Sequence, residues 1–299
     1  MLVALFGPTS SGKTALSVEL AQRIERDLGR PVVIVSADSR QVYRYLDIGT
    51  SKTTRAEMGG IRHEMIDVVE PVRKLELEEY ARLARPHLGL DGIALVVGGT
   101  GVYVKALLDG WTLDPVGKAR DALRRDFPRS MAADAYAMLR RLDKTTRVHP
   151  NNYEAVINAL AARMGGAAAA AGPASRAVVL GLDPGPTAID RRVAATYDDQ
   201  VRRGLFDEIQ SLAARYDLPA SRANQVLQTH GYREWFDVAH ERGKPLAALT
   251  AADRAEVRER VVAHIQGYTR RQRSWFAKLP GVRLVRSADQ AFSHLSTRS

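Results

Sequence analysis

The chain has 299 residues, of which 45% are hydrophobic and 26% charged, proportions that are typical of a globular enzyme. Its formal charge of +10 favours a polyanionic partner such as RNA but does not identify one. Cysteine is absent, which excludes disulfides and thiolate metal sites. The first residues lack a signal-peptide pattern and no apolar run is long enough to span a bilayer, so we expect a cytoplasmic protein without membrane contact.

The first predicted element is a strand over residues 2–6, followed by a glycine-rich loop over residues 7–14 and an amphipathic helix over residues 15–24. The loop reads Gly-Pro-Thr-Ser-Ser-Gly-Lys-Thr and fits the phosphate-binding pattern G-x-x-x-x-G-K-[ST]. In this pattern backbone N–H groups approach phosphate oxygens, Lys13 supplies a positive charge, and the Thr14 hydroxyl reaches a magnesium ion. The alternative is a glycine-rich turn that binds no ligand.

Further short apolar runs bounded by turn residues are predicted strands, at residues 32–35, 94–97, 177–182 and 282–285. Helical periodicity separates these runs, which predicts an α/β fold: a P-loop-type parallel sheet with flanking helices. Ligands of such sheets gather at the carboxyl ends of the strands. We therefore expect the loops that follow the first three predicted strands to lie together.

Two of these loops carry candidate chemistry besides the phosphate-binding loop. Asp38 follows the second predicted strand, and its carboxylate either binds magnesium or acts as a base; the alternative is a helix cap satisfied by local backbone donors. Thr100 lies in Gly98-Gly99-Thr100-Gly101, where the flanking glycines allow a ligand to approach the backbone. Here the alternative is a turn without a ligand.

Strand-like runs disappear after Trp111, and charge-rich helical patterns appear over residues 119–127 and 133–142. We therefore predict a small helical insertion at residues 111–172 within a catalytic core formed by residues 1–110 and 173–299. Five consecutive alanines lie within residues 165–172, a low-complexity stretch typical of a tether or a frayed helix end.

Three long helices are predicted in the last third of the chain, at residues 189–216, 223–242 and 251–278. The last contains Arg270-Arg271-Gln272-Arg273, which either binds RNA phosphates or the diphosphate or is the solvated face of the helix. Trp275 and Phe276 are predicted core residues. His63 and His149 lack the spacing of metal ligands, so neither is assigned to a metal.

Together these segments resemble the bacterial tRNA dimethylallyltransferases, which prenylate N6 of an adenosine next to the anticodon. Ordered matches extend from residue 7 to about residue 276. Besides the phosphate-binding loop and the two strand-end loops, they comprise Gln41-Val42-Tyr43, Leu46-Asp47-Ile48-Gly49-Thr50, His63, Ile66-Asp67, Val102-Tyr103, Ala106-Leu107-Leu108, His149-Pro150-Asn151, Gly231-Tyr232-Arg233-Glu234, Arg270-Arg271-Gln272 and Trp275-Phe276.

The resemblance implies a role for each matching residue. Asp38 would be the general base, and Thr100 would contact an oxygen near the scissile bond. Magnesium, bound at Thr14, would be the cofactor, and the partners would be dimethylallyl diphosphate and tRNA, which the helical insertion would contact. The diphosphate would be held by Gly7, Thr9, Ser10, Ser11, Gly12, Lys13, Thr14 and Arg192. The tRNA would be held by Ser39, Gln41, Tyr43, Arg233, Arg270 and Arg271.

The sequence also departs from the family pattern. Arginines that normally follow the His149 segment are replaced at Ala155 and Asn158, and a further basic position falls on Ala195 or Thr196. These losses bear on RNA recognition and on part of the diphosphate site. The alternatives are an isopentenyltransferase acting on free adenine nucleotides, a P-loop nucleotide kinase, or a non-catalytic RNA-binding relative. We expect a monomer.

Overall fold

The computed structural model describes residues 1–88, 91–108, 115–164, 177–218, 224–279 and 281–296. The chain forms two compact units, one made of residues Met1–Leu108 and Arg176–Ser299 and the other of residues Asp109–Ser175. The alanine-rich stretch predicted as a tether lies outside the described residues.

The larger unit is built on a parallel sheet with the strand order β3-β2-β4-β1-β5-β6. Its strands are β1 (Leu2–Phe6), β2 (Val32–Ser36), β3 (Arg62–Glu64), β4 (Ile93–Gly98), β5 (Val178–Gly181) and β6 (Arg283–Leu284). This arrangement confirms the predicted α/β class with a parallel sheet. The predicted strand at residues 282–285 is shorter than expected, and β3 was not predicted, because its sequence Arg-His-Glu contains no apolar run.

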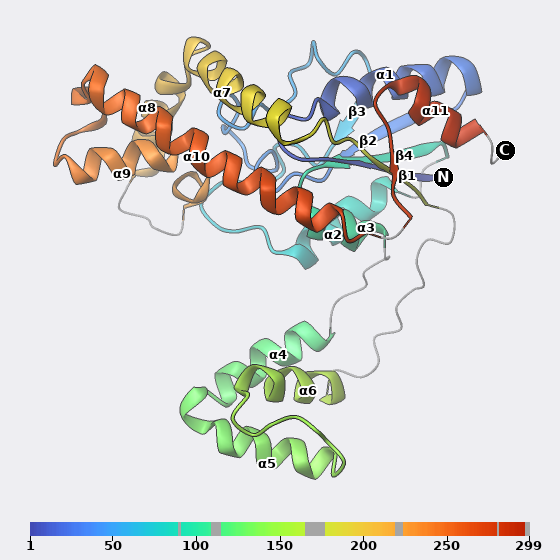
Figure 1. The fold of residues 1–299 in the computed structure, drawn as a ribbon, viewed down its shortest axis with the longest axis vertical. Helices are drawn as coiled ribbons and strands as arrows, with labels where there is room; N and C mark the ends of the chain where they lie inside the picture. The colour runs from blue at the N-terminus through green and yellow to red at the C-terminus, as the bar shows by residue number, and fades with distance from the viewer. Residues whose placement is uncertain (89–90, 109–114, 165–176, 219–223, 280, 297–299) are drawn as a thin grey trace. The chain divides into compact units, whose positions relative to one another are not determined.

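Helices cover both faces of the sheet (Figure 1). The helices of this unit are α1 (Lys13–Leu28), α2 (Leu77–Ala84), α3 (Gly101–Leu108), α7 (Pro186–Arg202), α8 (Leu205–Tyr216), α9 (Arg233–Glu241), α10 (Ala251–Phe276) and α11 (Ala288–Ser296). Of these, α8 packs on α7 and α9 packs on α10, away from the sheet. Alternate side chains of β1 point to opposite faces. Val3 and Leu5 pack in a core with α1 and α11, whereas Phe6 stacks on Phe276 of α10 with ring centroids 4.3 Å apart.

Two of the predicted long helices are interrupted. The predicted helix at residues 189–216 is two helices, because Gly204 adopts φ 96°, a left-handed conformation that ends α7 and caps α8. The predicted helix at residues 223–242 begins only at Arg233. A short 3₁₀ turn at Val226–Gln228 and the left-handed Gly231 precede it. The prediction for α10 is confirmed to within two residues.

The smaller unit is helical over its described residues. It contains α4 (Pro115–Asp126), α5 (Ala132–Leu142) and α6 (Tyr153–Met164). Its core is formed by Leu123 of α4, Leu139 of α5, and Val156, Ile157 and Leu160 of α6. This unit therefore has an apolar core of its own.

Within the described part of the chain, no helix combines the length and the apolar character needed to cross a lipid bilayer.

Candidate active site

A cavity of the larger unit, with a volume of about 270 Å³, lies at the carboxyl ends of β1, β2 and β4. Its lining includes residues 9–14 of the phosphate-binding loop, with Asp38 and Gln41 from the loop after β2 and Gly98 at the end of β4. The expected convergence of strand-end loops is thus observed. This is the position at which parallel sheets bind ligands.

The phosphate-binding loop is shaped by backbone conformations that its sequence allows. Gly12 caps α1 with φ 98° and ψ 14°, and Ser10 also has a positive φ, of 61°. The N-terminus of α1 therefore faces the cavity, where its N–H groups and dipole favour an anion. Lys13 donates to the Pro8 carbonyl oxygen at 2.7 Å, so its ammonium lies over the loop.

Lys13 is half-buried, and desolvation of its ammonium group lowers the pKa of that group to about 8, whereas the Asp38 carboxylate opposes the shift. Arg192 of α7 adds a second cation at the loop, because its Nη1 donates to the Ser11 carbonyl oxygen at 2.9 Å. Lys13 of the loop and Arg192 of α7 thus both bond to carbonyl oxygens of the phosphate-binding loop.

Asp38 is held by its own turn. Its Oδ1 accepts hydrogen bonds from the backbone N–H groups of Arg40, at 2.8 Å, and Gln41, at 3.4 Å. The capping geometry considered as an alternative is therefore present, and it coexists with a position in the cavity wall. The turn orients a carboxylate beside the Lys13 ammonium.

Thr100 joins the second and third strand-end loops. Its Oγ1 accepts the Ser39 N–H at 3.0 Å, and its own N–H donates to the Ala37 carbonyl oxygen at 3.1 Å. Both Thr100 and Ser39 are half-buried beside Asp38. The predicted catalytic pair is therefore connected through the backbone of the turn.

Gln272 of α10 joins the phosphate-binding loop to the glycine turn. Its Oε1 accepts the Thr9 N–H at 2.9 Å and its Nε2 donates to the Gly99 carbonyl oxygen at 2.7 Å. A Cβ atom at position 99 would lie 2.4 Å from Nε2, so any larger residue there would displace the Gln272 amide from this position. Sequence reasoning assigned the flanking arginines and missed Gln272, whose only signal was its place in the matched motif.

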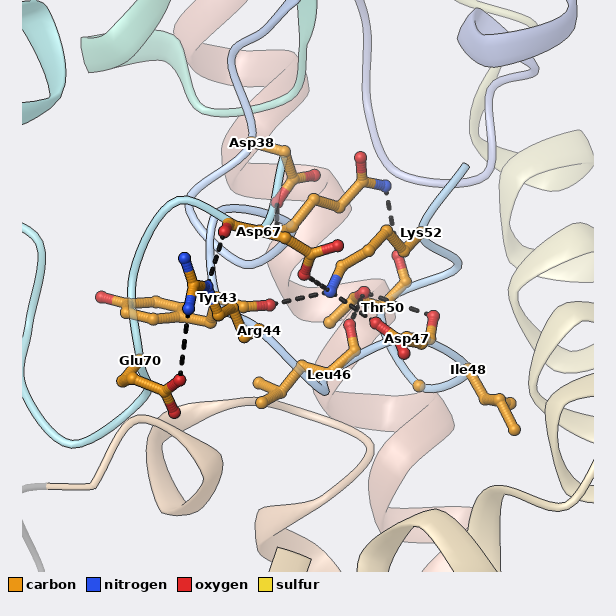
Figure 2. Close-up of polar contacts among 12 residues, drawn as sticks. Asp38, Tyr43, Arg44, Leu46, Asp47, Ile48, Thr50, Lys52, Asp67 and Glu70 are labelled. Atoms are coloured by element: carbon orange, nitrogen blue, oxygen red, sulfur yellow. Dashed lines mark hydrogen bonds and ion pairs between the residues drawn. The ribbon is translucent and has the colours of Figure 1, made fainter. Parts of the chain in front are cut away.

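Lys52 organises the loop between β2 and β3, as Figure 2 shows. Its side chain is only 5% exposed, and its Nζ lies 2.5 Å from Asp47 Oδ1, 2.6 Å from Asp67 Oδ1 and 2.8 Å from the Tyr43 carbonyl oxygen. Gln41 donates to the Ser51 carbonyl oxygen at 3.2 Å in the same loop. Lys52 therefore fixes the wall of the cavity that carries Gln41.

Glu208 of α8 holds the same loop from the other side. Its carboxylate accepts the backbone N–H of Ile48 at 2.8 Å and the Tyr232 hydroxyl at 2.6 Å. Neither Glu208 nor Lys52 was singled out from the sequence as a site residue. Glu208 bonds to a segment distant in the chain, and the contacts of Lys52 lie within an irregular loop that has no recognisable motif.

The predicted RNA-binding residues do not all lie on the surface. Tyr43 is 2% exposed and its hydroxyl accepts the Leu75 N–H at 2.8 Å, so the predicted RNA contact of Tyr43 is corrected to a core role. Arg233 is half-buried and pairs with Asp237 at 3.2 Å. Arg270 and Arg271 are exposed on α10, whereas Arg273 pairs with Asp183 at 2.9 Å.

The other residues named from the sequence also have defined places. Phe276 is buried, as predicted, whereas Trp275 is half-buried and packs against Gly101. Gly7 lies against the Leu182 carbonyl oxygen at the base of the phosphate-binding loop. Thr196 lines the cavity, whereas Asn158 accepts from Arg120 at 3.4 Å in the smaller unit.

Comparison with known families identifies the chain. A family model described as IPP transferase matches residues 41–279, and one described as isopentenyl transferase matches residues 1–74. The chain belongs to the IPP transferase family. It is 32% identical over 296 residues to a protein of Picosynechococcus named tRNA dimethylallyltransferase, covering 94% of this chain and 92% of the relative. The resemblance inferred from the motifs is thereby confirmed.

Solved structures of the IPP transferase family share the fold. The tRNA isopentenylpyrophosphate transferase of Bacillus halodurans aligns with a TM-score of 0.68 and 29% identity, covering 99% of this chain and 94% of that one. A eukaryotic dimethylallyltransferase described as acting on tRNA aligns with a TM-score of 0.70 at 23% identity, covering 99% of this chain and 77% of that one. This last likeness concerns the fold alone.

The pKa of Lys13 predicts how the affinity for a diphosphate depends on pH. A bound anion favours the charged ammonium, so affinity should be constant below a pH of about 8 and fall by about tenfold per pH unit above it. Calorimetric titration with dimethylallyl diphosphate measures this. Lys13→Arg is the matched control, because its guanidinium stays charged throughout the range. Identical profiles for the two proteins would contradict the assignment.

Replacing Lys52 by Met should lower the free energy of unfolding by about 1–3 kcal/mol, because two carboxylates and a carbonyl lose a charged donor. The cost is limited by the exposure of Asp47 and Asp67, whose side chains are 57% and 48% exposed. Urea denaturation measures the change. Lys74→Met is the control, since Lys74 pairs with Glu76 on the surface. Equal effects of the two substitutions would show that Lys52 has no special role.

Proposed function

We propose that the protein transfers a dimethylallyl group from dimethylallyl diphosphate to N6 of an adenosine next to the anticodon in tRNA. The observation that carries this proposal is one cavity lined by both a phosphate-binding loop and the Asp38 carboxylate. Membership of the IPP transferase family and relatives named tRNA dimethylallyltransferase support it. The family comparisons do not favour the nucleotide kinase or the enzyme acting on free nucleotides.

The phosphate-binding loop is suited to the leaving group of this reaction. When the allylic C–O bond breaks, positive charge develops on carbon and negative charge on the diphosphate. The Lys13 ammonium, Arg192 and the N–H groups at the start of α1 stabilise that negative charge in a partly enclosed site.

Asp38 is suited to accept a proton from the nucleophile. The adenine amine is a poor nucleophile because its lone pair is delocalised into the ring, so a carboxylate that accepts its proton assists the attack. The turn that binds Oδ1 orients this carboxylate, and the half-buried Thr100 lies beside it to contact the reacting diphosphate. The adenine must leave its stack to enter the cavity, at a cost of a few kcal/mol.

Magnesium fits the oxygen donors of the cavity. The Thr14 hydroxyl and the Asp38 carboxylate both line it, and hydroxyl and carboxylate oxygens are ligands that hard dications prefer. Thr14 is assigned to hold the ion at the diphosphate. A bound dication supplies neutralising charge to the leaving group.

RNA binding is assigned to exposed basic surface. Arg270 and Arg271 lie on α10, near the end that bears Gln272, while Ser39, Gln41 and Arg233 belong to the loops and helix around the cavity. The helical unit at residues 109–175 is assigned to tRNA contact as well. Exposed arginines at positions 125, 141 and 147 support that role, although Ala155 and Asn158 replace basic residues of the family pattern.

The protein acts as a monomer in the cytoplasm.

The proposal is tested by incubating the protein with labelled dimethylallyl diphosphate and either unmodified tRNA or AMP. Label should enter tRNA and not AMP, excess EDTA should stop transfer, and magnesium should restore it. Labelling of AMP alone would support the enzyme acting on free nucleotides, and full activity in EDTA would contradict the magnesium assignment.

Replacing Asp38 by Asn should lower turnover by about 10²- to 10⁴-fold, the usual contribution of a positioned base. The amide oxygen can still accept the Arg40 N–H, so the turn should persist and the affinity for the donor should barely change. Single-turnover transfer at saturating donor measures the effect. If donor binding is lost while transfer stays fast, Asp38 holds the metal and another group is the base.

Replacing Arg270 and Arg271 by Gln should weaken tRNA binding and reduce the steepness of log affinity against log salt by about 2. Each arginine that contacts a phosphate displaces counterions from the RNA on binding, so the variant displaces fewer of them. The matched control replaces Arg26 and Arg30, which are exposed near the end of α1 where Arg30 bonds the Gly92 carbonyl oxygen. An unchanged slope in the α10 variant would show that these arginines form a solvated face.

A further inference from the structure

Two histidines and a glutamate form a cluster where α9 meets α10. His230 lies in the turn before α9, Glu234 lies in the first turn of α9, and His264 lies on α10. The Nδ1 atoms of His230 and His264 lie 3.0 and 2.7 Å from the same carboxylate oxygen, Oε1 of Glu234. One ligand atom from each of the three residues lies within 4.8 Å of the other two.

Glu234 is a buried anion with a fixed orientation. Its side chain is 0% exposed, and its Oε2 accepts the Gly231 N–H at 2.8 Å, which directs Oε1 toward the two imidazoles. Burial would raise the pKa of this carboxyl group, but the hydrogen bonds from His230, His264 and Gly231 lower it to about 2. The group is therefore a carboxylate at every physiological pH.

The cluster offers the donors that zinc-class ions bind. Two imidazole nitrogens and one carboxylate oxygen form a ligand set known from zinc sites, in which the fourth position is open. Ligand atoms around a tetrahedral zinc ion are about 3.3 Å apart. The two nitrogen–oxygen separations, 3.0 and 2.7 Å, are shorter than this, and all three ligand atoms lie within 4.8 Å of one another, so rotations of the two rings would bring them to the spacing of a bound ion.

An ion can also reach the cluster. The side chains of His230 and His264 are 30% and 42% exposed, while Glu234 lies beneath them. The Gly231 N–H donates to Oε2 of Glu234, and hydrogen bonds of this kind orient carboxylates that bind metals. The cluster is thus accessible to solvent through its two imidazoles and contains an oriented carboxylate beneath them.

We infer that His230, Glu234 and His264 form a binding site for a dication of the zinc class, separate from the diphosphate cavity. When the ion binds, each imidazole is neutral and carries its proton on Nε2, so that Nδ1 coordinates the ion in place of its hydrogen bond to Glu234, and a solvent molecule takes the fourth position. Mg²⁺ is disfavoured, because it prefers oxygen donors over imidazole. The inference does not depend on the proposed reaction.

The site would fasten α9 to α10 near the cavity. Ile265, next to His264, lines the cavity, and Gln272 follows two helical turns later on α10. Burial raises the pKa of the hydroxyl of Tyr197, another cavity residue, and the nearby Glu234 carboxylate raises it further. A metal here would therefore stabilise the helix that carries the Gln272 contact.

The test uses the full chain without an affinity tag, stripped of metal by EDTA and dialysed. Calorimetric titration with Zn²⁺ should show one ion bound per chain, and Co²⁺ should give the ligand-field absorption of a four-coordinate site. His264→Ala should weaken Zn²⁺ binding by at least about tenfold. The matched control is His240→Ala, which removes an exposed histidine of α9 outside the cluster.

A second readout keeps the test decisive if His264→Ala folds poorly. Zn²⁺ should raise the melting temperature of the wild type, because an ion that binds only the folded state stabilises it, and should raise that of His230→Ala much less. Absence of Zn²⁺ binding to the wild type would overturn the inference. Equal affinities of the wild type and of whichever cluster variant folds would overturn it as well, leaving the cluster as a hydrogen-bonded pair of imidazoles on a carboxylate.

Discussion

The side-chain amide of Gln272 is the contact on which the geometry of the site depends. It is buried, accepts the Thr9 N–H of the phosphate-binding loop and donates to the Gly99 carbonyl oxygen. These two loops follow adjacent strands, β1 and β4, and the amide comes from the far end of the chain. An unpaired buried N–H or C=O group costs about 1–3 kcal/mol, so both loops are held to α10.

Around this contact the cavity is assembled from polar groups that fix one another. Thr100 joins the glycine turn to the turn of Asp38, Lys52 holds the loop that carries Gln41, and Glu208 of α8 binds the backbone of that loop. The Lys13 ammonium and the Asp38 carboxylate therefore line one cavity in a fixed relation, and Arg192 contacts the phosphate-binding loop at Ser11. Such preorganisation is what transfer from a diphosphate to a weak nucleophile requires.

The sequence predicted those parts of the fold and site that depend on local patterns. Apolar runs located five of the six strands, and the spacing of Gly7, Gly12, Lys13 and Thr14 located the phosphate-binding loop. The polar edge strand β3 had no such pattern. The break at Gly204 was missed because one left-handed residue interrupts an otherwise continuous helical periodicity. Gln272 and Glu208 bond to backbone atoms of distant segments, which no local pattern encodes, and Tyr43 could be read equally as a surface or a core residue.

The affinity of a Gln272→Leu variant for dimethylallyl diphosphate tests the account most directly. Leucine has a similar size but leaves the Thr9 N–H and the Gly99 carbonyl without their partner, so the loop should lose its fixed geometry. We expect the dissociation constant to rise by about tenfold or more, which corresponds to about 1.4 kcal/mol or more. A variant that folds and binds the donor as tightly as the wild type would contradict the central role of this contact.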